Sequence, residues 1–346
     1  MGFDKMMSTI HTWDVNVTML KLRQLIYFLL IVTSYQIHAG NSVASVTLDN
    51  DYFVNSDDGY TSGLYLAVYE KGSLDNESVL PQPSFLVTPL LWSMPSKGVD
   101  EAINAYNIGQ SMFTPSDITR TVPDANDIPY SAIIALTNSY ILSSRNHADV
   151  VSTTVGVVGP AALGKQSQNA IHSILGSEAP KGWDAQLRNE AVFQFGRGRV
   201  WRSWSSELDN YDLLTTAKAN LGTLQSSVSS NVIVRYGRDL RHSFASVLLM
   251  DTRTSNPIAV DGEWYLYLGV QAQYVFNQIY TDGNTYRDSA SVDYDHTFIG
   301  LNYGLTYSWG RSALTFAVNH SDLFQSESEQ YRNDTRYGTL TYSWSM

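Results

Sequence analysis

The chain has no cysteine and few charged residues, and these two shortages exclude several classes of protein. Of its 346 residues only 16% are charged, whereas 43% are hydrophobic and 12% are aromatic. Without a thiol, the chain forms neither a disulfide scaffold nor a cysteine-ligated zinc or iron–sulfur site. Its apolar content is too high for an intrinsically disordered protein. A net charge of −11 argues against a nucleic-acid partner bound through charge.

Long hydrophobic runs and the common catalytic motifs are missing as well. The longest apolar run, Leu25–Thr33, is well short of the roughly 20 residues that a membrane-spanning helix requires. A polytopic helical membrane protein is therefore excluded. The sequence contains no H-E-x-x-H, G-x-S-x-G or Walker-type motif, which argues against zinc hydrolases, serine hydrolases and nucleotide-binding proteins.

We predict that residues 1–39 are a secretory signal peptide. Lys21 and Arg23 precede the apolar run, and polar residues then lead to the small residue Ala39. This order of basic, apolar and small residues is typical of signal peptides, although a buried N-terminal helix is an alternative. Residues 1–18 are long and polar for such a signal, which favours a translation start at Met19. Cleavage near Ala39 leaves a mature domain of residues 40–346.

The mature chain shows the two-residue alternation of β-strands. Near its end Leu340, Tyr342 and Trp344 alternate with small polar residues, so one face is apolar and the other polar. The same pattern recurs along the chain and predicts about twelve strands. They are expected at residues 43–50, 60–70, 103–113, 129–143, 149–158, 186–201, 212–222, 226–237, 263–277, 293–308, 313–320 and 335–346.

A soluble sandwich and a closed barrel both accommodate such strands. The segments are close to the 9–11 residues with which a tilted strand crosses a bilayer, and a closed sheet has no unpaired edge for lipid to meet. Together with the signal peptide, these features favour an all-β fold: a transmembrane antiparallel barrel in the bacterial outer membrane. We expect the barrel to be a monomer. One departure is the last residue, Met346, because many such barrels end in an aromatic residue.

Residues 160–176 break the strand pattern and predict a short helix. Pro160 suits the start of a helix and Gly176 the position after its end. Leu163, Ala170, Ile171 and Ile174 are predicted to share an apolar face, and Lys165, Gln168, Asn169 and His172 a polar one. The helix therefore carries a histidine that is either a solvated residue or a catalyst.

A second polar cluster lies at the end of the first strand. Asp49, Asn50 and Asp51 are followed by Asn55, Asp57 and Asp58. Carboxylate and amide oxygens are the ligands that calcium prefers. A polar turn whose side chains cap their own backbone is equally compatible with this spacing.

Several strings in the sequence resemble the outer-membrane lipid A 3′-O-deacylase family over about residues 43–346. The most specific are Gly156–Pro160, Gln168–His172 and Gly182–Asp184, and the supporting strings are Leu48–Phe53, Asp58–Gly63 and Ile108–Pro115. The resemblance implies a twelve-stranded barrel with a site between its wall and a helix near the outer surface. It also implies calcium-dependent hydrolysis of an ester-linked acyl chain from the lipid A of lipopolysaccharide.

The resemblance also implies the site residues. It assigns catalytic roles to Asn50, Asp51, Thr61, His172 and Glu178, with Asn50, Asp51 and Thr61 as the calcium ligands. Arg120 occupies a position where the family can place a base near lipid phosphates. Lys165 and Lys181 are further candidate bases for substrate binding, with exposed surface lysines as the alternative.

The resemblance is incomplete at one string. Where many relatives have Asp-Arg-Pro-Tyr-Ala-Gly, this chain has Ile128 in place of the arginine. Two alternatives to a lipid A deacylase therefore stay open. One is a non-catalytic barrel, either a pore or a surface-binding protein, and the other is an outer-membrane phospholipase.

Overall fold

The computed structural model describes residues 42–54, 59–74, 79–175, 179–238, 240–252, 264–321 and 336–346. The described residues from Val43 to Met346 form one compact unit, and residues 1–41 lie outside the described residues. The predicted signal peptide therefore stays a prediction.

All twelve predicted strands are present, with ends shifted by a few residues. They are β1 (Ser42–Asn50), β2 (Gly59–Ser73), β3 (Glu101–Thr114), β4 (Ser131–Ser143), β5 (His147–Val158), β6 (Glu190–Ser205), β7 (Tyr211–Gly222), β8 (Gln225–Gly237), β9 (Trp264–Gln278), β10 (Thr297–Trp309), β11 (Ser312–His320) and β12 (Arg336–Ser345). Short helices join or follow them: η1 (Asp51–Val54), η3 (Thr88–Ser93), η4 (Pro160–Ala162), α2 (Gly164–Leu175), η5 (Trp183–Ala185), η6 (Leu240–His242), η7 (Phe244–Thr252) and α3 (Ile279–Asp282).

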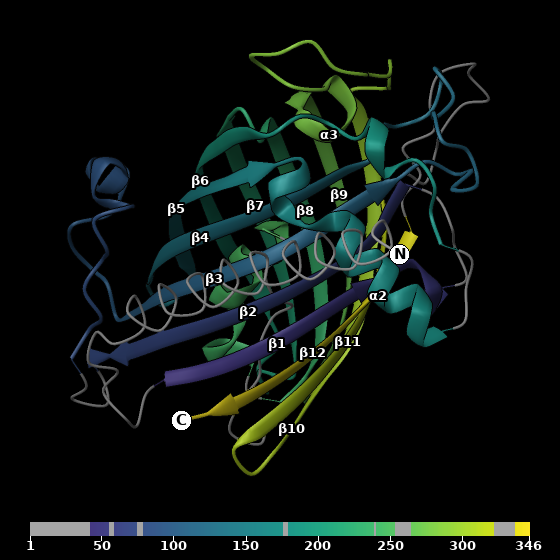
Figure 1. The fold of residues 1–346 in the computed structure, drawn as a ribbon. Helices are drawn as coiled ribbons and strands as arrows, with labels where there is room; N and C mark the ends of the chain where they lie inside the picture. The colour runs from purple at the N-terminus through teal and green to yellow at the C-terminus, as the bar shows by residue number, and fades with distance from the viewer. Residues whose placement is uncertain are drawn as a thin grey trace, which may run out of the picture. The chain divides into compact units, whose positions relative to one another are not determined.

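The strands form one closed antiparallel barrel in which each strand pairs with its neighbours in sequence (Figure 1). Closure is made by β1 and β12, with Val43 opposite Ser345 and Asn50 opposite Gly338. The predicted barrel is therefore confirmed, and the soluble sandwich is excluded. Among the described residues, no helix is long and apolar enough to cross a membrane.

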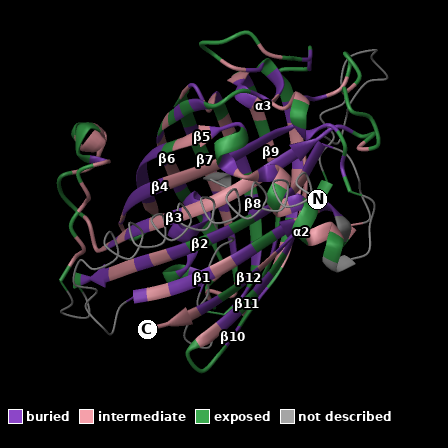
Figure 2. Cartoon of the chain, viewed as in Figure 1, coloured by how far each residue is buried: buried purple, intermediate pink, exposed green. Residues whose placement is uncertain are grey.

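Along the strands, buried residues alternate with more exposed ones (Figure 2), and the side chains that face the lumen are mostly polar whereas those on the outer surface are mostly apolar. On β8, Asn231 and Arg235 are buried in the lumen, whereas Val232 and Val234 are each 49% exposed on the outer face. On the lumen side, threonine pairs form hydrogen bonds between neighbouring strands. The hydroxyl oxygens of Thr47 and Thr341, for example, lie 2.9 Å apart. This polarity is the reverse of that in a soluble protein and suits a barrel surrounded by lipid.

The two ends of the barrel differ. We call the end that holds Val43 and Ser345 the terminal end, and the opposite end, where β5 leads into α2, the helix end (Figure 1). Helix α2 packs against the outer face of β4 at the helix end. At the terminal end, residues 79–100 with η3 lie against the outer face of β3, β4 and β5, where Val87 is fully buried.

Helices η6 and η7 form a plug in the lumen at the terminal end. Phe244, Leu248 and Leu249 are at most 3% exposed and pack among the inward-facing apolar residues of the wall. The fully buried Arg235 holds the plug, since its guanidinium donates to the Ser243 hydroxyl at 2.9 Å and to the Leu240 carbonyl at 2.6 Å. Its charge is balanced by Asp212, at 2.7 Å.

Candidate active site

The acidic segment at the end of β1 is divided between the two faces of the wall. The Asp49 carboxylate points into the lumen, where it accepts a hydrogen bond from the Tyr60 hydroxyl at 2.9 Å. Because successive side chains of a strand alternate, Asn50 lies on the outer face. Asp51 begins η1 and is 7% exposed. Asn50 and Asp51 of this acidic segment are therefore retained in the candidate site, whereas the side chain of Asp49 lies in the lumen.

Asn50 and Thr61 lie together at the start of β2. The Asn50 side-chain amide donates to the Thr61 carbonyl at 3.3 Å. Thr61 occupies a bulge, where the register between β2 and β3 shifts between Tyr60 and Ser62. A bulge re-aims a side chain, and here the Thr61 hydroxyl lies 2.6 Å from that of Thr114. Thr114 was not among the predicted site residues. It lies within Ile108–Pro115, one of the strings that resemble the family, and this string was the signal that could have identified it.

Helix α2 begins later than predicted, and two of its residues differ in burial from the prediction. Leu163 has a left-handed backbone, with φ of 62°, which separates the 3-10 turn η4 from α2, so the helix starts at Gly164 rather than Pro160. Gln168, predicted on the polar face, is buried at 2% exposure, whereas Ala170 is exposed. Gln168 is buried because its carbonyl oxygen accepts the Trp183 indole N–H at 2.7 Å, which satisfies both polar groups.

The contacts beneath α2 place His172 on the same outer face as Thr61. Ile171 packs against a cluster that contains Met112 and Trp183. Met112 faces outward and lies opposite Ser62, the residue after Thr61, in the β2–β3 register. His172 follows Ile171 and is half-buried. Helix α2 and Thr61 therefore lie on the same outer face of the wall at the helix end.

Gly164 sets the distance between α2 and the wall. A Cβ atom at this position would lie 2.5 Å from both the Ala132 Cβ and the Trp183 ring. We expect Gly164→Val to displace the helix, because Ala132 is fixed in β4 and the Trp183 ring is completely buried. Trypsin digestion will measure this, since Lys165 lies in the first turn of the helix and Lys181 follows the helix in the chain.

The matched control is Gln166→Val, on the exposed face of α2. Gly164→Val should speed cleavage at these lysines, whereas Gln166→Val should leave the rate near that of the wild type. Equal rates for the two variants would contradict the close packing of the helix.

The two candidate phosphate-binding bases are paired with acids at the surface. Arg120 lies 2.9 Å from Asp124, and Lys165 lies 2.8 Å from Asp184. The pKa of Asp124 is lowered by the hydrogen bond from the Asn126 backbone and then by Arg120. Exposed pairs of this kind contribute at most about 1 kcal/mol. An anionic ligand can therefore compete for both bases at little cost.

Tyr130 supports the loops that carry these bases. Its hydroxyl donates to the Ile118 carbonyl at 3.3 Å, and its ring lies 5.0 Å from that of Trp183. Burial raises the pKa of Tyr130 to about 12, so the hydroxyl stays protonated and keeps donating near neutral pH. The loop of Arg120 is thereby joined to the segment that follows α2.

The predicted calcium site stays a prediction, and the described residues give only the chemistry of its proposed ligands. Among the described residues, no three histidine, aspartate or glutamate side chains cluster closely enough to hold a metal ion. Asn50, Asp51 and Thr61 instead offer amide, carboxylate and hydroxyl oxygens, which are hard ligands of the kind that calcium accepts. Glu178, the remaining predicted residue, lies outside the described residues.

The surroundings of Ile128 give a physical reason for an isoleucine at this position of the string. Its side chain is 1% exposed and packs with Tyr60, Phe113 and Leu187 in an apolar cluster. An arginine placed in this cluster would need a partner for its buried charge. The isoleucine therefore makes an apolar contact at the position where an arginine was expected from the resemblance.

A closed sheet with a polar lumen and an apolar outer surface defines the chain as an outer-membrane β-barrel. Residues 25–346 match the family described as outer membrane protein LpxR. The chain belongs to this family, which confirms the resemblance seen in the sequence.

One solved structure shows the same fold, and a second is less similar. LpxR from Salmonella typhimurium matches with a TM-score of 0.68 and 18% identity, over 88% of this chain and 100% of that one. The translocator domain of autotransporter NalP from Neisseria meningitidis matches with a TM-score of 0.40 and 11% identity, over 96% of this chain and 98% of that one. No curated protein matches the chain.

Proposed function

We propose that the protein is a lipid A 3′-O-deacylase of the outer membrane, which hydrolyses the ester of the 3′-linked acyl chain. The observation that carries the proposal is the position of His172. Its helix packs on the outer face of the wall, on the same face as Asn50 and Thr61. An acyl chain in the membrane meets the outer face of a barrel and not its lumen. Membership of the LpxR family supports the same assignment.

His172 is proposed as the general base. A neutral imidazole accepts a proton from water while the water oxygen attacks the acyl carbonyl carbon. The ester C–O bond then breaks, and the imidazolium returns the proton to the departing sugar oxygen, which releases a fatty acid. Glu178 is proposed to orient the imidazole. Arg120 and Lys165 would bind the lipid phosphates in place of Asp124 and Asp184.

Calcium is the proposed cofactor, and Asn50, Asp51 and Thr61 would hold it. When bound there, it would stabilise the negative charge that develops on the carbonyl oxygen. The bulge at Thr61 and its hydrogen bonds to Asn50 and Thr114 keep these oxygen ligands in one place.

The calcium proposal predicts that a chelator abolishes deacylation by the purified protein and that added calcium restores it. Asp51→Asn should raise the calcium concentration for half-maximal activity by about tenfold or more, because the variant removes the one carboxylate of the proposed ligand set. Release of fatty acid from lipopolysaccharide, followed as a function of calcium, measures both effects.

Asp49→Asn is the matched control for this experiment. Asp49 is two residues away but points into the lumen, where an asparagine can still accept from Tyr60. Its calcium dependence should equal that of the wild type. Activity that persists in chelator would rule out the calcium proposal. Release of fatty acid from glycerophospholipid but not from lipopolysaccharide would instead identify a phospholipase.

A further inference from the structure

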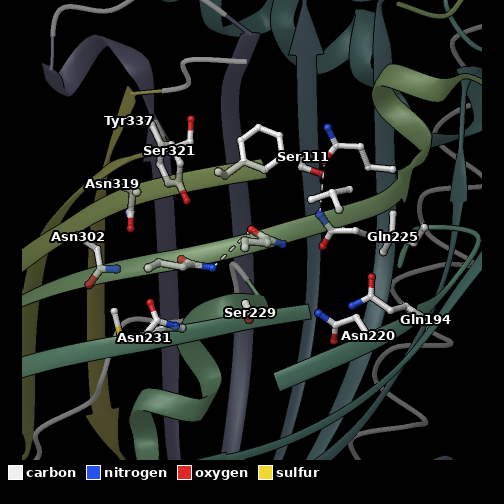
Figure 3. Close-up of a pocket in the computed structure, with 18 of the residues that line it drawn as sticks. Ser111, Gln194, Asn220, Gln225, Ser229, Asn231, Asn302, Asn319, Ser321 and Tyr337 are labelled. Atoms are coloured by element: carbon white, nitrogen blue, oxygen red, sulfur yellow. Dashed lines mark hydrogen bonds between the residues drawn. The ribbon is translucent and has the colours of Figure 1, made fainter. Parts of the chain in front are cut away.

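The lumen contains a cavity of about 250 Å³ between the plug and the helix end. Val247 and Met250 of η7 line its floor, and Tyr280 and Ser321 line it near the helix end. Figure 3 shows polar side chains from several strands pointing into this space. The cavity lies on the opposite side of the wall from His172, so it is separate from the proposed catalytic site.

The lining is polar but carries almost no charge. Ten of its residues are asparagine or glutamine, and none of the lining residues in the described part of the chain is Asp, Glu, Lys or Arg. The whole chain has a net charge of −11, so this neutrality is not a consequence of composition. A charged ligand would enter this cavity without a countercharge, which is costly. The lining therefore selects for a neutral ligand.

Several of the amides have unused hydrogen-bonding capacity. Asn231, Asn302 and Gln278 are 5%, 7% and 1% exposed. Each has one side-chain amide atom without a hydrogen-bond partner among the described residues. Such an atom destabilises the fold when it is buried without a partner, and a ligand that bonds to it removes that cost. An amide offers both donors and an acceptor, which matches a ligand whose hydroxyl groups both donate and accept.

Aromatic rings lie beside these amides. Phe113 and Tyr280 both line the cavity and stack on each other with centroids 4.0 Å apart. Phe298 and Tyr337 also contribute to the lining. A sugar ring has C–H groups that pack on aromatic rings and hydroxyls that bond to amides, so it uses both kinds of surface at once. Small-molecule pockets combine apolar surface with a few convergent polar groups in the same way.

We propose that this lumen cavity binds a neutral saccharide of about one ring, which enters from the helix end. The cavity volume limits the size of the ligand. The uncharged amide side chains favour a neutral ligand over a charged one, and the aromatic rings favour a cyclic sugar over a linear polyol. The plug closes the terminal end, so the cavity holds the sugar and does not conduct it.

The test uses the full mature chain, refolded in a zwitterionic detergent that has no sugar head group. Glucose and galactose are titrated and followed by saturation-transfer NMR, with glucuronate and glucosamine as charged analogues. We expect saturable binding of at least one neutral sugar, and binding of both charged analogues that is weaker by about tenfold or more. Absence of saturable binding by both neutral sugars, or equal binding of a charged analogue, would overturn the proposal.

Two neighbouring residues of β8 supply the variants. Ser229→Trp fills the cavity and should abolish binding, whereas Val228→Trp places the same ring on the outer face and should leave it unchanged. Asn302→Ala should weaken binding about tenfold by removing its hydrogen bonds. Binding that survives Ser229→Trp would place the sugar elsewhere. Deacylation should be unaffected by Ser229→Trp, so the two proposals fail independently.

Discussion

His172→Ala and His172→Gln are each expected to lower lipid A deacylation by about 10²–10⁴-fold, because loss of a general base removes that much of a rate enhancement. Glutamine keeps much of the size and polarity of histidine but takes no proton from water. The two variants should therefore be equally inactive. The measurement is the mass of lipid A after incubation of the purified protein with lipopolysaccharide and calcium.

The control for this prediction is Ser173→Ala. Ser173 is the next residue of α2 and is exposed, so its loss should leave the rate unchanged. Heat-modifiable migration in gels will show that every variant is a folded barrel. A His172→Gln protein with wild-type activity would remove His172 from the mechanism. If the wild-type protein never shortens lipid A, the proposed function itself is wrong.

The two-residue alternation predicted the barrel because it reflects the environment on each side of the wall. Leu340 and Tyr342 alternate with threonines whose partners line the lumen, and Thr341 bonds to Thr47 in the structure. A strand that separates lipid from a polar lumen must show this pattern along its whole length. The positions of the twelve strands could therefore be read without any contact between strands being known.

The site was only partly predictable, because its details depend on contacts between distant residues. The burial of Gln168 depends on Trp183, and the distance between α2 and the wall depends on the close approach of Gly164 to Ala132. The Thr61–Thr114 pair depends on a bulge that shifts the β2–β3 register. Helical periodicity contains none of these contacts, so it placed Ile171 correctly on the face toward the wall but exchanged the environments of Gln168 and Ala170.

The plug was missed for a related reason. Residues 240–252 are rich in apolar residues but show no alternation, and they follow β8 in what reads as a loop. Only the closed barrel supplies the inward-facing surface, including Leu214 and Tyr265, on which η7 is buried. The plug also bears on the pore alternative, because it fills the lumen at the terminal end with apolar side chains.

Removal of the plug is therefore expected to convert a silent barrel into a conducting one. In planar bilayers the wild-type protein should show no ion conductance. The triple variant Phe244→Ser, Leu248→Ser, Leu249→Ser should show discrete conductance steps, because each of these buried side chains contributes roughly 1.5–3 kcal/mol to keeping η7 in place. Replacement of residues 240–252 by a glycine–serine segment of equal length should give larger steps.

Arg241→Ser is the control, since Arg241 lies in η6 but is exposed, and it should stay silent. Deacylation should persist in the triple variant, because α2 packs on the outer face of the wall whereas the plug is buried in the lumen. A wild-type protein that already conducts would favour the pore. If the barrel without the plug does not conduct ions, other side chains in the lumen must block the passage. The expected result is conductance that appears only when the plug is removed, together with unchanged deacylation. It would show that the lumen is not needed for catalysis and that the reaction takes place on the outer face of the wall.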